Sequence, residues 1–154
     1  MSEHRASLNW NRDRDDFKYP TYTRDHTWSF RGGEMVRASA AHEFLGNADR
    51  VDPEEAFVAS ISACHMLTFL AIAAKRRFVV DRYSDNAVGY LEENDEGRMA
   101  VTRVELRPEI AFSGETFPGP DQIDSMHRMS HQECFIANSV STEIVVLQSH
   151  RGKC

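Results

Sequence analysis

The chain has 154 residues, a net charge of −6 and 41% hydrophobic residues, a size and composition typical of one globular domain spanning residues 1–154. The acidic balance argues against nucleic acid as a partner, because phosphate binding needs a basic face. We expect no apolar run long enough to cross a membrane and see no secretory signal near Met1, so the predicted protein is cytoplasmic, with no membrane partner.

The first third of the chain is predicted to form short strands joined by loops. Weak apolar alternation and the turn-forming run Arg31-Gly32-Gly33 support this prediction. In chain order, we expect a strand at 5–10, a long polar connection at 11–25, strands at 26–30 and 34–39, and a loop at 42–51.

Residues 53–75 are predicted to form a long helix that is apolar on nearly every side, and such a helix belongs in the core of a fold. Asp52 suits the N-cap, Pro53 suits the first helical position, and Glu55 lies three residues after the cap, as in a capping box. Glu54 and Glu55 also lie where the helix dipole favours anions.

The rest of the chain is predicted to form a β-hairpin, a helix and a strand. Residues 93–97 contain Asp and Gly, which suit a hairpin turn. The apolar positions change phase near Thr102 and Arg103, so we expect a bulge or bend there. The elements together predict an α+β fold of two layers. In chain order, we expect hairpin arms at 84–92 and 98–112, a loop at 114–120, a helix at about 121–134 and a strand at 141–148.

Three widely spaced cysteines suggest a pool of reduced thiols rather than a disulfide framework. Cys64 lies in the middle of the apolar helix, Cys134 follows seventy residues later, and Cys154 is interpreted as a bystander. A reactive thiolate needs a cationic or hydrogen-bonding neighbour. His65 is adjacent to Cys64 in sequence, but successive helical residues point about 100° apart, so it is not automatically the partner of that sulfur. The alternative for Cys64 is a buried, unreactive thiol.

A zinc site is a second hypothesis. His127, His131 and Cys134 fall at i, i+4 and i+7 on one helix face, and Cys64 would complete a Cys2His2 set. The alternative is that the two histidines belong to a solvated helix face. Tight Cys-x2-Cys pairs, which zinc sites usually have, are absent from the sequence, and we expect no metal and no organic cofactor.

Glu54 has no capping role of its own, which leaves it open to acid–base chemistry. Ten residues separate it from Cys64, about 15 Å along a straight helix. If both residues serve one site, either the helix bends or the glutamate meets the cysteine of a second chain. The second possibility predicts a homodimer.

The run from Val51 to Cys64, VDPEEAFVASISAC, resembles the central-helix motif of the osmotically inducible protein C and organic hydroperoxide resistance (OsmC/Ohr) family. In that motif Asn/Asp-Pro-Glu opens the helix, and the reactive cysteine follows ten residues after the glutamate, as Cys64 follows Glu54 here. The family's second cysteine lies sixty to seventy residues later in a Cys-x-x-Ser/Ala-Asn-like segment, similar to Cys134-Phe135-Ile136-Ala137-Asn138.

The resemblance implies an OsmC-like fold of antiparallel sheets wrapped around a long central helix, in an intertwined homodimer. It also implies a peroxiredoxin-like thiol peroxidase that reduces organic hydroperoxides in oxidative stress defence. Cys64 would be the peroxidatic cysteine and Cys134 the resolving cysteine. An external dithiol, either a lipoyl group or a small thiol, would then reduce their disulfide.

By the same resemblance, Glu54 would hold an arginine against the thiolate. Arg24 is our choice for this arginine, with Arg37 and Arg50 in reserve, because one branch of the family carries it about thirty residues upstream of the glutamate. The other branch carries it just upstream of the glutamate, where this chain has Glu43. The rival hypothesis is a redox-sensing or ligand-binding OsmC-like module with little turnover.

Overall fold

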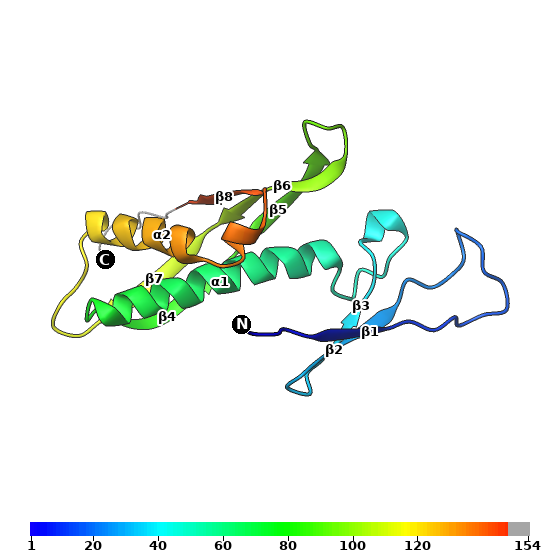
Figure 1. The fold of residues 1–154 in the computed structure, drawn as a ribbon, viewed down its shortest axis with the longest axis horizontal. Helices are drawn as coiled ribbons and strands as arrows, with labels where there is room; N and C mark the ends of the chain where they lie inside the picture. The colour runs from blue at the N-terminus through cyan, green and yellow to red at the C-terminus, as the bar shows by residue number, and fades with distance from the viewer. Residues whose placement is uncertain (148–154) are drawn as a thin grey trace. The chain divides into compact units, whose positions relative to one another are not determined.

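The computed structural model describes residues 1–147 and divides the chain into two compact units (Figure 1). The first unit covers Met1–Ala56, and the second begins at Phe57. Each unit has strands of its own, so each is described by itself.

The first unit is built on a three-stranded antiparallel sheet in the order β1-β2-β3. The predicted glycine turn closes the hairpin between β2 and β3, where the Gly33 N–H donates to the Phe30 carbonyl at 3.0 Å. The three strands predicted in this part of the chain are therefore confirmed. They are β1 (Ala6–Asn9), β2 (His26–Phe30) and β3 (Met35–Ala38), followed by the short 3-10 helix η1 (His42–Phe44).

Gly46 lies in the connection after η1, where the backbone folds closely back on itself. Its N–H donates to the Ala41 carbonyl at 3.1 Å, and a Cβ added at this position would lie 1.6 Å from the Ala40 carbonyl oxygen. Because that contact is with backbone, Gly46→Ala forces the loop to move and is expected to cost about 3 kcal/mol or more of unfolding free energy. Chemical denaturation checks this. Gly32→Ala, whose Cβ would meet no atom within 4 Å, is the control and should lose far less.

Helix α1 (Pro53–Lys75) confirms the predicted helix and its N-terminal cap. The Glu55 N–H donates to Asp52 Oδ1 at 2.7 Å, and the Asp52 N–H donates back to Glu55 Oε2 at 3.2 Å. This reciprocal pair is a capping box, which satisfies two of the free N–H groups at the start of the helix.

The expectation that no segment could span a membrane was wrong for α1. By length and composition this helix could cross one, because an 18-residue window within it has a mean hydropathy of 1.9. The apolar core helix of a soluble fold meets the same criterion, and α1 packs against the strands of the second unit. Its buried residues are Ile61, His65, Phe69, Ile72 and Ala73.

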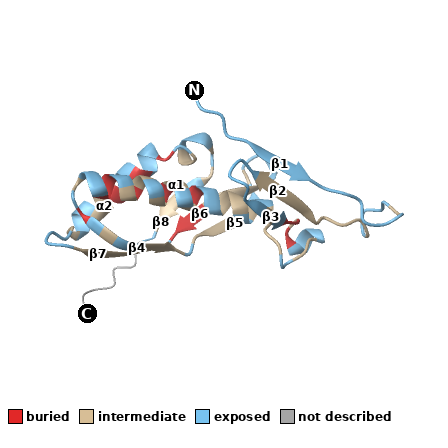
Figure 2. Ribbon diagram, turned by 90° about the horizontal axis from the view of Figure 1, so that it is seen from below, coloured by how far each residue is buried: buried red, intermediate tan, exposed pale blue. Residues whose placement is uncertain are grey.

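The second unit has two layers, with helices α1 and α2 on one side and strands on the other (Figure 2). Its strands form two small sheets, in which β4 pairs antiparallel with β7, β5 pairs antiparallel with β6, and β8 runs parallel to β6. The elements are β4 (Val79–Asp85), β5 (Val88–Glu93), β6 (Met99–Leu106), β7 (Pro108–Ser113), α2 (Pro120–Glu133), the 3-10 helix η2 (Ala137–Ser139) and β8 (Glu143–Val146).

The predicted hairpin is confirmed, together with its bulge. Tyr90 pairs with Arg103 and Leu91 pairs with Val101, so Thr102 is the extra residue in β6. The second arm, however, was predicted as one strand, whereas the structure interrupts it at Arg107.

Strand β4 was missed, and Asp85 at its end explains how the neighbouring arm is divided. Asp85 Oδ1 accepts the Arg107 backbone N–H at 2.6 Å, and Asp85 Oδ2 accepts the Ser62 hydroxyl, also at 2.6 Å. One carboxylate thus links α1, the end of β4 and the junction between β6 and β7. A charged residue within an otherwise weak apolar pattern gives no signal of this role.

Two clusters of buried side chains hold the second unit together. The first cluster joins α1 to α2 and to the sheet of β4 and β7, and the second joins α1 to β6. Their buried members are Phe69, Ile72, Ala73, Phe78 and Met126 in the first, and Ile61, Val104 and Leu106 in the second.

Candidate active site

The two thiols predicted as a redox pair meet in the second unit. Cys64 is half-buried on α1, and Cys134 is buried with 1% of its surface exposed. The Cys64 side chain lies close enough to Cys134 to affect the ionisation of its thiol. Both are free thiols in this structure. The chain therefore places one partly accessible thiol against one that is shielded from solvent.

The end of α2 fixes the position of Cys134. The helix ends at Glu133, and Cys134 is its C-cap residue in an extended conformation. The chain then turns back, since the Asn138 N–H donates to the Cys134 carbonyl at 3.0 Å and the Ala137 N–H points to the Cys134 sulfur at 3.4 Å. The predicted Cys-x-x-Ala-Asn segment is thus a turn around this sulfur.

Burial raises the pKa of the Cys134 thiol, and the neighbouring Cys64 side chain raises it further. The backbone N–H groups of Ala137 and Ile136 oppose this effect, because they favour a thiolate. The net direction keeps Cys134 protonated near neutral pH. A protonated, shielded thiol is a poor first nucleophile, so the accessible Cys64 is the better candidate for that role.

His65 does not bond to its sequence neighbour Cys64 but reaches α2. Its Nε2 lies 3.0 Å from His127 Nδ1, and the two rings are 1% and 4% exposed. Burial lowers the pKa of each histidine to about 4. His65 is therefore a packed, hydrogen-bonded histidine of the core.

The zinc hypothesis finds no support in the geometry. Within residues 1–147, no three His, Cys, Asp or Glu side chains are grouped so that they could hold a metal ion. His127 turns its Nδ1 to His65, and Cys134 contacts Cys64 instead of the two histidines of α2.

Tyr83 packs on the same core, with its ring 5.7 Å from that of Phe69. Its buried hydroxyl has no hydrogen-bond partner among the described residues, and burial together with nearby Asp85 raises its pKa. Tyr83→Phe is therefore expected to raise the unfolding free energy by about 1 kcal/mol, because an unpaired buried hydroxyl is costly. Urea denaturation checks this, and a loss of stability would show that the hydroxyl has a partner in solution.

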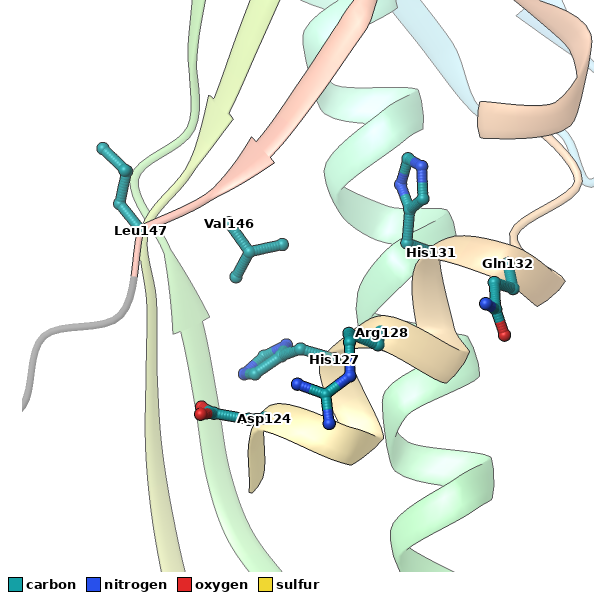
Figure 3. A pocket seen from close by; sticks show the side chains of 7 residues that line it. All are labelled: Asp124, His127, Arg128, His131, Gln132, Val146 and Leu147. Carbon is teal, nitrogen blue, oxygen red and sulfur yellow. The ribbon is translucent and has the colours of Figure 1, made fainter. Parts of the chain in front are cut away.

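A cavity of about 630 Å³ lies between α2 and the end of β8 (Figure 3). His127 and Asp124 extend from the helix toward the strands, and Val146 and Leu147 lie opposite them (Figure 3). The cavity therefore opens onto one of the two buried histidines. Its full lining is Asp124, His127, Arg128, His131, Gln132, Val146 and Leu147.

The two other predicted site residues belong to the first unit. Glu54 lies half-buried in the first turn of α1. Arg24 donates from Nη1 to the Tyr22 carbonyl at 2.5 Å and from Nη2 to the Tyr19 carbonyl at 2.6 Å. Its guanidinium also lies 3.8 Å from the centre of the Tyr22 ring. Arg24 thus braces its own loop, and its role toward a thiolate stays a prediction, as does that of Glu54.

The reserve arginines also lie in the first unit. Arg50 Nε contacts Asp25 Oδ2 at 2.9 Å, and Arg37 lies in β3 opposite Thr27. Arg24 lines an aromatic cavity of about 350 Å³ in this unit. The residues around that cavity are Trp10, Phe17, Tyr22, Arg24, His26, Ser39, Ala40 and Pro53.

Comparison with known proteins decides the family. The family model described as OsmC-like protein matches residues 46–148, about two-thirds of the chain. The chain belongs to the OsmC-like family. The resemblance found in the Cys64 and Cys134 motifs is therefore confirmed at the level of family and fold, and a redox or peroxidase role is consistent with this membership. The search among curated proteins found no match.

Solved structures agree with this assignment. The OsmC-like protein of unknown function VCA0330 from Vibrio cholerae is 49% identical, with 97% of this chain and 100% of that chain covered and a TM-score of 0.93. An organic hydroperoxide resistance protein OsmC from Legionella pneumophila is 16% identical, with 97% and 96% covered and a TM-score of 0.70. One from Elizabethkingia anophelis is 18% identical, with 96% and 94% covered and a TM-score of 0.69. The last two likenesses concern the fold.

One functional feature of this OsmC-like chain escaped the sequence analysis, namely the bond between His65 and His127. The two residues lie on different helices, and their sequence separation of 62 carries no periodic signal. His127 was considered either as a metal ligand with His131 or as part of a solvated helix face, and the second expectation is wrong for His127, which is 4% exposed. The usable signal was its place on the apolar face of α2 beside Met126, which suggests a histidine that faces the core.

Proposed function

We propose that this OsmC-like protein is a cysteine-based peroxidase that reduces organic hydroperoxides. The observation that carries the proposal is the pairing of two free thiols, a half-buried Cys64 next to a buried Cys134. Two thiols in contact are the requirement for a peroxidase that ends its oxidative half-cycle in an internal disulfide.

The proposed reaction uses both thiols in turn. The Cys64 thiolate attacks the terminal peroxide oxygen, the O–O bond breaks, and the alcohol leaves with a proton. Cys64 is then a sulfenic acid. The Cys134 sulfur attacks the Cys64 sulfur, water leaves, and a disulfide forms. An external dithiol, a lipoyl group or a small thiol, returns both cysteines to the thiol state. Each cycle reduces one hydroperoxide to one alcohol and one water.

The unequal exposure of the two thiols supports this division of roles. A peroxide arriving from solvent meets the partly exposed Cys64, whereas Cys134 is shielded. The raised pKa of Cys134 keeps it protonated until a sulfenic acid forms beside it. We assign the supporting roles to Glu54 and Arg24: the arginine stabilises the thiolate and orients the peroxide, and the glutamate positions the arginine.

A homodimer is part of the proposal. Only 28% of the apolar 18-residue window of α1 is buried, and Leu67 on this helix is 62% exposed. An apolar face of this kind is more stable when it is covered. We assign a second copy of the chain as the cover. Helix α1 is continuous, and Glu54 is about 15 Å from Cys64 along its axis. The two residues can therefore serve one site only if Glu54 of one copy meets Cys64 of the other. Sedimentation analysis tests this assignment, and a monomer at micromolar concentration would exclude it.

The reduced wild-type protein, without any reductant, tests the proposed function. Mixed with excess cumene hydroperoxide, it should consume one equivalent rapidly and form a Cys64–Cys134 disulfide, mapped by mass spectrometry of peptides. Free cysteine at the same pH is the reference for an unactivated thiol. Consumption no faster than this reference would support the redox-sensing module with little turnover. Thiols left intact would exclude both functions.

A further inference from the structure

The His65–His127 bond links the two helices that carry the thiols. His65 directly follows Cys64 on α1, and His127 lies two helical turns before Cys134 on α2. Their ring nitrogens are 3.0 Å apart, and both rings are almost completely buried. The link therefore joins the same two helices as the thiols, one residue from Cys64 and seven residues from Cys134, inside the packed layer of the second unit.

Within residues 1–147, the other side-chain hydrogen bonds between the two helices all come from Arg76. Farther along α1, Arg76 Nη2 contacts Ser125 Oγ at 3.2 Å and Met129 Sδ at 2.9 Å. The imidazole rings also pack on the core, since the His127 ring lies 4.5 Å from the Phe69 ring. The histidine pair is thus both a hydrogen bond and part of the apolar packing that sets the helix spacing.

The bond requires that at least one of the two rings be neutral. One ring nitrogen must carry the proton and the facing nitrogen must offer a lone pair. If both facing nitrogens carried protons, the bond would become a repulsive contact at 3.0 Å. Adding a proton elsewhere on either ring would instead place a charge in the core, which is costly without a partner.

The surrounding charges act on the pair in opposite directions. His131 on α2 disfavours a charge on His65, whereas Asp124 on α2 and Asp85 on β4 favour one on His127. Arg128 also lines the cavity that His127 faces. His127 is thus one of the residues that line the cavity between α2 and the end of β8 (Figure 3).

We propose that the neutral His65–His127 pair is a positioning element that holds Cys64 against Cys134 for disulfide formation, and that its protonation loosens this contact. The proposal rests on the proposed function for its role in the cycle. The alignment itself does not depend on peroxide, so it can be tested with a different oxidant.

The test is the equilibrium between the protein and glutathione. One glutathione disulfide and the two protein thiols exchange for one protein disulfide and two glutathione thiols. The equilibrium constant measures how well the fold aligns Cys64 with Cys134. His127→Leu removes the bond. The double variant His65→Gln with His127→Asn keeps an amide in place of each facing nitrogen but cannot titrate.

At pH 7, His127→Leu should lower this constant about tenfold, and the double variant should stay within about twofold of wild type. Between pH 7 and pH 4 the wild-type constant should fall toward that of His127→Leu, because both histidines have pKa values of about 4. The double variant keeps both cysteines. The change of its equilibrium constant with pH therefore measures how much ionisation of the thiols contributes.

A purely structural role predicts a different outcome. In that case His127→Leu lowers the melting temperature but leaves the glutathione constant unchanged, which would overturn the proposal. An equal acid response in wild type and double variant would overturn it as well. If the variants do not fold, nitrogen NMR of the imidazole rings in the wild-type protein replaces them. The proposal then requires that the rings become protonated with the same pH midpoint as the fall in the equilibrium constant, and a different midpoint would overturn it. Failure of peroxide consumption alone would refute the proposed function and leave this positioning role intact.

Discussion

Cys64→Ser is expected to lower the rate of cumene hydroperoxide consumption by at least about 100-fold, since removal of a covalent nucleophile typically costs several orders of magnitude. A serine hydroxyl is not ionised near neutral pH and cannot replace the thiolate as attacking group. The substitution changes one partly exposed atom on α1, so the fold should persist. Stopped-flow measurement with a dithiol present gives the rate, and circular dichroism confirms the helix content.

Two matched variants make the result specific. Cys134→Ser should still consume about one equivalent of peroxide but leave a sulfenic acid at Cys64, which a dimedone adduct would reveal. Cys154→Ser, at a position outside the described residues, should behave like wild type. If Cys64→Ser and wild type consume peroxide equally slowly, the peroxidase assignment is wrong.

Acidification is expected to destabilise the protein through the buried histidine pair. The pKa of each ring is about 4 in the folded chain, compared with 6.5 for an unperturbed histidine. The unfolded state therefore binds more protons, so the stabilisation is complete above about pH 6.5 and is lost as the pH falls toward 4. Between pH 7 and pH 5 the unfolding free energy should fall by about 2 kcal/mol for each histidine.

Urea denaturation at several pH values measures this dependence. The double variant His65→Gln with His127→Asn is the control. Between pH 7 and pH 5 its unfolding free energy should fall less than that of wild type, and the difference should equal the contribution expected from the two histidines. His131→Gln replaces the exposed histidine of the same helix and should retain the acid sensitivity. If the unfolding free energy depends on pH equally in wild type and double variant, the acid sensitivity comes from groups other than these two histidines.

The fold could be predicted from sequence wherever a local signal was strong. The capping box at Asp52 and Glu55, the glycine turn before β3 and the phase change at Thr102 each act over a few residues, and each is observed. Strand β4 has no such signal, because it alternates poorly and is stabilised by its pairing with β7. The resemblance of α1 to a membrane span was missed because the helix meets a criterion of mean hydropathy over 18 residues without being one unbroken apolar run.

The candidate site could also be predicted only where the sequence carries a local signal or a family motif. The thiol pair could be predicted because a family motif marks both cysteines, and the structure brings their sulfurs together. The two histidines that join the helices could not, because a pairing across 62 residues depends on tertiary packing. The supporting arginine remains a prediction for a different reason, since any of several residues in the first unit has a suitable side chain.

The contact between Cys64 and Cys134 also couples oxidation to the lifetime of the folded chain. A disulfide between them would close a loop of seventy residues and stabilise the protein by about 4 kcal/mol through the lost freedom of the unfolded chain. The oxidised molecule would then open less often to proteases than the reduced one. Pulse proteolysis of the reduced and the oxidised form would measure the difference.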